Sequence, residues 1–390
     1  MSRTSTASDA IEPFHINIPQ PALDDLKLRL NLARWPERET VSDWAQGVPL
    51  DEAQALIDYW RTHYDWRRFE NRVNKLPHFR TTIDGLGIHF IHVKSKYDDA
   101  LPLLLTHGWP GSFIEFFHTI PLLTDPMAFG GKVEDAFHVV IPSLPGFAFS
   151  DKPTESGWNT VRIAKAWIVL MQRLGYQNWV AQGGDWGAGV TTILGHMRPQ
   201  GLLAIHLNWQ FVFPEKIPEK LLHDEQRAVD GANKFLTDGS GYFHEQSTRP
   251  QTIGYALSDS SVALATWIYE KFHAWTDNKG NPSDALQLDE MLDNITLYWL
   301  TNTGTSSARI YWECQAAGAV RFAGPKLDLP VAASVFPHEI YRALKSWAQQ
   351  KYSNLIYWNE LEKGGHFAAF EQPELFTEEL RAAFRTLRHA

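Results

Sequence analysis

The fold is decided by the stretch Val180-Ala181-Gln182-Gly183-Gly184-Asp185-Trp186-Gly187-Ala188-Gly189. It reads as a strand that turns sharply into a helix, and its centre is the nucleophile-elbow pattern G-x-S-x-G with aspartate in place of serine. The flanking glycines permit the tight turn, because a Cβ at either position would clash. We therefore expect Asp185 to stand above a sheet, where its carboxylate can attack an electrophilic carbon and form an ester. An ordinary strand–glycine–helix turn would show the same pattern, so the rest of the chain must decide.

Apolar runs alternate with helical patterns on both sides of this turn. Runs typical of buried strands lie at Leu101–Thr106, Phe137–Ile141, Trp179–Gln182, Leu202–Leu207, Val331–Phe336 and Asn354–Trp358. A helical pattern covers Val161–Leu174, and another begins near Pro373. This order predicts an α/β fold with a mostly parallel central sheet covered by helices.

The residues ahead of this alternation form an extension. Leucines at helical spacing predict a helix from Pro21 to Trp35, which Pro36 would end. A second helix is expected from Leu50 towards Leu76, with Asp51 and Gln54 in the positions of a capping box. Residues 79–93 read as a hairpin of two strands.

A long helical and aromatic segment interrupts the second half of the alternation, and we interpret it as a lid over the sheet. The predicted organisation has four parts: an N-terminal extension (1–95), a first part of the α/β core (96–211), a helical lid (212–318) and a second part of the core (319–390).

Composition limits the classes of function. The net charge is −9 over 390 residues, and no basic stripe is present, which argues against nucleic acid as a partner. The single cysteine, Cys314, excludes an internal disulfide framework and fits a reducing compartment; a buried thiol is a better interpretation of it than a nucleophile. No apolar window reaches the ~20 residues of a membrane helix, so we expect no membrane contact and a cytoplasmic location. No His/Asp cluster has metal-ligand spacing, so neither metal nor organic cofactor is expected. A homodimer is one candidate assembly.

A carboxylate nucleophile needs a base, because its ester must be hydrolysed by an activated water. His366 stands in a glycine-containing loop just after the last strand, at the end of the sheet where sites form. Its imidazole needs an orienting carboxylate, and Glu339 follows the penultimate strand directly. Asp328 is the rival, but it precedes that strand and should lie at the opposite end of the sheet. The chain order of acid, acid, histidine is typical of α/β-hydrolases.

The tetrahedral intermediate also needs an oxyanion hole. The segment His107-Gly108-Trp109-Pro110-Gly111-Ser112 follows the first core strand. We predict that the backbone N–H groups of Trp109 and Trp186 are the two donors, although glycine and proline also build ordinary turns.

The nucleophile limits the substrate. Aspartate suits displacement at a saturated carbon, where an alkyl ester remains, and the leaving group is then an epoxide oxygen or a halide. An epoxide oxygen needs acids close by, and a tyrosine can serve, since a phenol has a pKa of about 10. The lid contains Tyr242 and Tyr311 among the twelve tyrosines of the chain, but composition alone does not select these two. A halide needs N–H donors such as the indole of Trp186 beside the nucleophile. The residues by themselves leave both chemistries open.

Nearly the whole chain resembles epoxide hydrolases of the microsomal type, including their soluble fungal and bacterial relatives. The matching segments are Phe14–Pro19 with the following helix to Trp35-Pro36, the HGxP motif at His107–Pro110, the nucleophile motif at Gly183–Gly187, the tyrosine segments at Gly241–Gly254 and Arg309–Tyr311, Phe-Pro-x-Glu at Glu339, and Gly-Gly-His-Phe at His366. Dehalogenases are similar in fold and share Asp-Trp-Gly, but they lack the first tyrosine segment and the N-terminal extension. The membrane-bound members begin with an anchor that this chain lacks, so the resemblance implies a soluble member.

The resemblance implies an α/β-hydrolase fold with a helical lid and an N-terminal extension, and an activity that converts an apolar epoxide to a vicinal diol. In this interpretation Asp185 attacks the epoxide carbon while Tyr242 and Tyr311 protonate its oxygen. His366, oriented by Glu339, then activates water against the ester. A haloalkane dehalogenase with the same nucleophile is the enzymatic alternative, and a catalytically silent binding protein is the non-enzymatic one.

Overall fold

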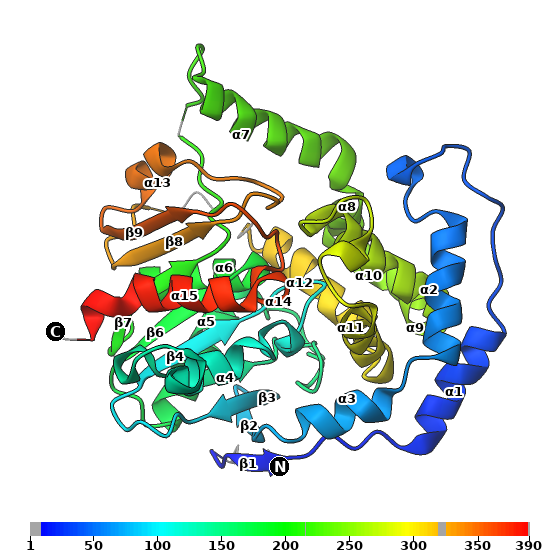
Figure 1. Ribbon diagram of the computed structural model, residues 1–390, viewed down its shortest axis with the longest axis horizontal. Coiled ribbons are helices and arrows are strands. Elements are labelled where there is room, and N and C mark those ends of the chain that lie inside the picture. The colour runs from blue at the N-terminus through cyan, green and yellow to red at the C-terminus, as the bar shows by residue number, and fades with distance from the viewer. Residues whose placement is uncertain (1–8, 215, 319–324, 389–390) are drawn as a thin grey trace, which may run out of the picture.

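The computed structural model describes residues 9–214, 216–318 and 325–388 (Figure 1). Among these residues, nine strands form one sheet in the order β1-β2-β3-β5-β4-β6-β7-β8-β9. The strands are β1 (Glu12–Phe14), β2 (His78–Ile83), β3 (Leu86–Val93), β4 (Leu101–Thr106), β5 (Phe137–Pro142), β6 (Trp179–Gly183), β7 (Leu202–Leu207), β8 (Val331–Val335) and β9 (Leu355–Glu360). All pairs from β5 to β9 are parallel, and β1, β2 and β3 extend the edge in antiparallel pairs. The predicted mostly parallel sheet is confirmed.

The described residues also form helices. They are α1 (Gln20–Asn31), α2 (Leu50–Thr62), α3 (Trp66–Val73), α4 (Thr119–Thr124), α5 (Thr160–Arg173), α6 (Asp185–Met197), α7 (His223–Lys234), α8 (Gly241–Thr248), α9 (Pro250–Asp259), α10 (Ser261–Trp275), α11 (Leu288–Leu300), α12 (Gly304–Ala316), α13 (Lys345–Lys351), α14 (Ala368–Glu371) and α15 (Pro373–Phe384). Helices α5 and α6 pack together, as do α4 and α15. Every residue of β6 is buried, as expected for a central parallel strand with both faces covered.

Three predictions for the N-terminal extension were wrong. Helix α1 ends at Asn31 rather than Trp35, because a proline at 36 disfavours helical backbone in the residue before it and clashes one turn back. The single helix expected from Leu50 is two helices, α2 and α3, and the Asp65 side chain caps the second. The capping box is absent because α2 begins at Leu50, so Asp51 lies inside the helix.

The hairpin of β2 and β3 is confirmed. Asp84 and Gly85 form its two-residue turn with positive φ values of 50° and 77°, the backbone that matches the twist of antiparallel strands. The sequence did not predict β1, which pairs with β2.

The segment between β7 and β8 is helical in its described part, from α7 to α12. Figure 1 shows α1 and α2 running along the outer side of α9 and α10, while α7 stands apart from the body. Helix α3 packs against α11, and α1 and α2 against α10. The N-terminal extension thus wraps the helical segment rather than the sheet alone. Among the described residues, no helix combines the length and apolar character needed to span a bilayer.

Candidate active site

Asp185 occupies the turn between β6 and α6. The strand ends at Gly183 and the helix begins at Asp185, whose φ of 47° lies in the left-handed region, where a non-glycine residue is strained. A Cβ on Gly187 would lie 1.9 Å from the Thr106 carbonyl oxygen, so only glycine lets α6 start this close to the end of β4. The strained elbow predicted from the sequence is therefore present.

The loop after β4 closes over the Asp185 carboxylate. The Trp109 N–H donates a hydrogen bond to Oδ1 of Asp185 at 2.8 Å. A Cβ on Gly108 would lie 2.1 Å from the same oxygen, so glycine is required there as well. One carboxylate oxygen is thus fixed in the predicted oxyanion position, and Oδ2 is left to react. The N–H group of Trp186 as second donor stays a prediction.

His366 reaches Asp185 from the loop after β9. Its Nε2 lies 3.4 Å from Oδ2 of Asp185, and its Nδ1 lies 2.5 Å from Oε1 of Glu339. The backbone N–H of His366 donates to the Trp275 carbonyl at 2.8 Å, which fixes the loop against α10. Burial lowers the pKa of the imidazole, but the carboxylates of Glu339 and Asp185 outweigh it and raise that pKa well above its usual value. The free site therefore contains a histidinium between two carboxylates at neutral pH.

Glu339, rather than Asp328, is the carboxylate beside His366. Oε1 of Glu339 also accepts the Ile340 N–H at 2.8 Å, which holds the carboxylate in place. Asp328 forms an exposed ion pair with Arg198 at 2.8 Å instead. The choice made from strand order agrees with this geometry.

Tyr242 and Tyr311 face each other across the site. Tyr242 lies in the first turn of α8 and Tyr311 on α12, and their ring centroids are 5.8 Å apart. Trp109 stacks on the Tyr242 ring at 5.1 Å, and Trp186 meets the Tyr311 ring edge-on at 4.8 Å. Burial raises the pKa of both phenols well above the usual value; the charge of Asp185 adds to this at Tyr242, and Tyr242 and then Asp185 add to it at Tyr311. Both hydroxyls are therefore protonated at neutral pH and able to donate.

The two tyrosines and Asp185 line a cavity of about 470 Å³. Aromatic rings make up much of its wall: Trp186, Trp209, Phe211, Phe213, Phe235 and Phe243. The Tyr311 hydroxyl is buried and has no hydrogen-bond partner among the described residues. A predominantly apolar pocket with a few convergent polar groups is the usual form of a small-molecule site.

Helix α11 supports the oxyanion loop, which sequence reasoning missed. The Asn294 side chain donates to the Pro110 carbonyl at 2.8 Å and accepts from Oγ of Ser112 at 2.8 Å. The Tyr298 hydroxyl donates to the Gly111 carbonyl at 2.7 Å. Asn294 and Tyr298 are four residues apart and so share one helix face. That spacing is the signal in the sequence, but it does not say which loop the face meets.

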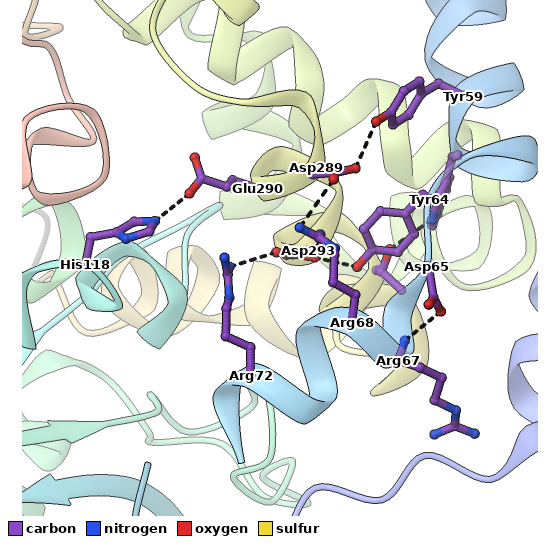
Figure 2. Close-up of polar contacts among 12 residues, drawn as sticks. Tyr59, Tyr64, Asp65, Arg67, Arg68, Arg72, His118, Asp289, Glu290 and Asp293 are labelled. Atoms are coloured by element: carbon purple, nitrogen blue, oxygen red, sulfur yellow. Dashed lines mark hydrogen bonds and ion pairs between the residues drawn. The ribbon is translucent and has the colours of Figure 1, made fainter. Parts of the chain in front are cut away.

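Helix α11 also contacts the N-terminal extension (Figure 2). Asp293 is fully buried and accepts hydrogen bonds from the Tyr64 hydroxyl at 2.7 Å and from Nη2 of Arg68 at 2.9 Å. Arg72 adds a longer contact of 3.4 Å. Asp293 precedes Asn294 directly, so one turn of α11 connects α3 to the oxyanion loop. The N-terminal extension therefore helps to hold the oxyanion loop.

Other candidate groups lie outside this chemistry. Cys314 is buried, and burial raises the pKa of its thiol to about 11, which confirms the buried-thiol interpretation. Within the described ranges, no group of three or more His, Cys, Asp and Glu side chains is arranged to hold a metal ion.

Comparisons with known proteins agree with the fold. Residues 11–116 match the family described as "Epoxide hydrolase N terminus", and residues 102–235 match the alpha/beta hydrolase fold. A Stigmatella aurantiaca protein named "Putative epoxide hydrolase" is 67% identical over 379 residues, which cover 97% of this chain and 86% of that protein. The structure of Aspergillus niger epoxide hydrolase aligns with a TM-score of 0.86 and 34% identity over 98% of this chain and 97% of that one. The juvenile hormone epoxide hydrolase of the silkworm Bombyx mori aligns with a TM-score of 0.90 and 29% identity, over 98% and 96%.

Proposed function

The chain belongs to the epoxide hydrolase family and is an enzyme of the α/β-hydrolase fold, and we propose that it opens epoxides through a covalent ester on Asp185. The observation that carries the proposal is the position of this carboxylate. Trp109 holds Oδ1, while Oδ2 faces His366, and the residue lines the aromatic cavity. Oδ2 is the oxygen that forms the new bond to an epoxide carbon, because it is not held by the Trp109 N–H group.

In the first step, the C–O bond of the epoxide breaks as the ester bond to Oδ2 forms. Negative charge develops on the epoxide oxygen, and the protonated hydroxyls of Tyr242 and Tyr311 donate to it. The buried hydroxyl of Tyr311 makes no hydrogen bond of normal geometry among the described residues, which supports this role, because a poorly satisfied buried donor gains most when a ligand supplies an acceptor.

In the second step, His366 removes a proton from water, and the resulting hydroxide attacks Cγ of Asp185. The N–H groups of Trp109 and Trp186 stabilise the oxyanion. The ester bond to the alkyl group then breaks, the alkoxide takes the proton from His366 and leaves as the diol, and the Asp185 carboxylic acid returns its proton to His366. Glu339 keeps the proton on Nδ1 of His366, so that Nε2 is the nitrogen that accepts. No step uses a metal or an organic cofactor.

The cavity also indicates the class of substrate. Its aromatic walls favour an apolar epoxide, aryl or alkyl, with the strained ring between the two phenols and Asp185. Halide displacement is no longer the competing interpretation, since the family is that of the epoxide hydrolases.

The test follows the fate of the ester. Diol formation from styrene oxide should vanish in Asp185→Ala. His366→Gln should accumulate protein that is heavier by the mass of one substrate, with the modification on the peptide containing Asp185. A single turnover in ¹⁸O-labelled water should label Asp185 rather than the diol. Asp328→Ala is the matched control for Glu339→Ala, and only the latter should slow turnover. Unmodified His366→Gln protein after exposure to substrate, or label found first in the diol, would refute the covalent mechanism.

Assembly as a homodimer and a cytoplasmic location stay predictions. Light scattering coupled to size-exclusion chromatography tests the first, and fractionation of the source cells tests the second.

A further inference from the structure

A second, much smaller cavity meets Asp185 from another side. Its volume is about 20 Å³, and its lining includes Thr106, Glu115, Asn208 and His366. Of the residues described by the structure, Asp185 alone lines both this cavity and the aromatic one. A polar cavity needs about 10–15 Å³ to hold one water molecule, so this cavity has room for a single water beside the carboxylate.

Glu115 brings a carboxyl group to this cavity. It lies in a short 3₁₀ turn, Phe113–Phe116, and follows the predicted oxyanion donor Trp109 by six residues. A Cβ on Gly111 would lie 1.3 Å from Oε1 of Glu115, so the carboxyl fills the space that this glycine leaves beside the oxyanion loop. A larger residue at position 111 would displace the Glu115 carboxyl from this place.

The carboxyl of Glu115 is mostly neutral at pH 7. Burial raises its pKa to about 8, with a further contribution from the negative charge of Asp185, while His366 and the Ser112 N–H lower it. A neutral carboxyl offers a carbonyl oxygen as acceptor without placing a second negative charge next to the nucleophile. The proposed mechanism so far gives this buried group no role.

A water that attacks the ester has two O–H groups and two lone pairs, and each needs a partner. One lone pair must point to Cγ of Asp185, and one O–H must point to Nε2 of His366. The second O–H needs an acceptor, which the carbonyl oxygen of Glu115 supplies. The remaining lone pair needs a donor, and Asn208 has one in its Nδ2 group, because its Oδ1 already accepts from Nε2 of Gln182 at 2.7 Å.

We propose that the small cavity holds the water that hydrolyses the Asp185 ester, and that Glu115 is a positioning residue for that water; the inference rests on the proposed covalent mechanism. As the O–Cγ bond forms, one O–H bond breaks and Nε2 of His366 takes the proton. The second O–H keeps its hydrogen bond to Glu115. The ester C–O bond then breaks, and the alkoxide of the product takes the proton back from His366. The carboxylic acid that this leaves on Asp185 passes its proton to Nε2 of His366, which restores the carboxylate and the histidinium of the free site. Water therefore approaches from a different side than the epoxide.

The test separates the two half-reactions. Trp109 and Trp186 lie beside Asp185, so stopped-flow tryptophan fluorescence with styrene oxide should follow ester formation and ester hydrolysis as two phases. In Glu115→Met, which keeps the length of the side chain and removes the acceptor, hydrolysis should slow about tenfold, the size of one lost hydrogen bond. Ester formation should change less than twofold. Consequently kcat and KM should fall together, while kcat/KM stays constant.

Glu115→Gln is the matched control, because its amide carbonyl keeps the acceptor. It should hydrolyse the ester at close to the wild-type rate. Glu115→Ala takes the place of the methionine variant if that protein does not fold, and thermal unfolding checks each variant. The assignment is overturned if hydrolysis in Glu115→Met or Glu115→Ala proceeds at the wild-type rate, or if both phases slow equally. Absence of any ester in the wild type would instead refute the covalent mechanism itself.

Discussion

Tyr311→Phe should make the protein more stable and less active at once. The Tyr311 side chain is 2% exposed, and its hydroxyl has no hydrogen-bond partner among the described residues. In the free enzyme the hydroxyl has lost its contacts with water, and only weaker contacts with the Trp186 indole and the Tyr242 hydroxyl replace them. In the proposed reaction it gains an acceptor, the oxygen of the opening epoxide. Its removal therefore affects the two states in opposite directions.

The magnitudes follow from the energies of hydrogen bonds. A buried polar group without a partner costs about 1–3 kcal/mol. Allowing for the small void left by the missing oxygen, we expect the free energy of unfolding to rise by about 1 kcal/mol, or a Tm about 1–2 °C higher in a chain of this size. A hydrogen bond to a group that becomes charged contributes about 1.5–3 kcal/mol. Loss of it should slow ester formation about 10-fold to 150-fold.

Tyr298→Phe is the matched control for the change in stability. Tyr298 is 1% exposed, and its hydroxyl donates to the Gly111 carbonyl at 2.7 Å. The same substitution there leaves a buried carbonyl without a donor and should cost about 1–2 kcal/mol. The two variants lose the same atom at similar burial, so only the hydrogen-bonding state of the hydroxyl distinguishes them.

Thermal unfolding followed by circular dichroism gives the stability of both variants. Stopped-flow fluorescence with styrene oxide gives the rate of ester formation in Tyr311→Phe. If Tyr311→Phe lowered the Tm as Tyr298→Phe does, the hydroxyl would have a partner in the free enzyme. If ester formation kept its wild-type rate, Tyr311 would be a packing residue, and the role of acid would fall to Tyr242 alone.

The remaining predictions concern charge and support. Asp185→Asn mimics the uncharged ester, so the pKa of His366 in this variant, measured by NMR titration, should fall below its wild-type value. The base must be neutral, so ester hydrolysis in the wild-type enzyme should become slower as the pH falls through that lower pKa. Asn294→Ala should reduce kcat/KM about tenfold, since it frees the loop that carries the Trp109 N–H group, and an unchanged value would show that the loop is held without it. Asp293→Ala should lower the free energy of unfolding in urea by about 2–3 kcal/mol, because the Tyr64 hydroxyl and Arg68 lose their acceptor, and equal stability would show that these bonds contribute nothing net.

The sequence was sufficient for the parts of the site whose chemistry is local. A glycine pattern at Asp185 specifies the elbow because the turn itself requires it, and strand order places His366 and Glu339 at the same end of a parallel sheet. Glu339 was preferred to Asp328 on that ground, and the geometry agrees. Tyr242 and Tyr311 were located through resemblance, since twelve tyrosines offer no physical reason to choose two.

What the sequence did not yield depends on contacts between distant segments. The hydrogen bond from Asn294 to the Pro110 carbonyl joins residues 184 positions apart, and the hydrophobic periodicity of a helix does not predict such a distant partner. Glu115 was passed over for the same reason, because a glutamate in a short turn reads as a solvated charge until its cavity is known. The break between α2 and α3 depends on Asp65, which caps the second helix; a hydrophobic pattern that continues across the break hides it.

The charge of Asp185 links the two steps of the proposed reaction. In the free site, this charge and that of Glu339 hold the pKa of His366 well above its usual value, so the imidazole carries a proton when the epoxide arrives. Ester formation removes the charge of Asp185 but not that of Glu339. The pKa of His366 then falls, since burial now opposes only one carboxylate, and the proton can pass towards the phenols that protonated the alkoxide. His366 thereby becomes a neutral base at the moment when the ester needs one, with Nδ1 still bound to Glu339 and Nε2 free. Ester formation at Asp185 thus converts His366 to the neutral base, and no separate conformational change is required.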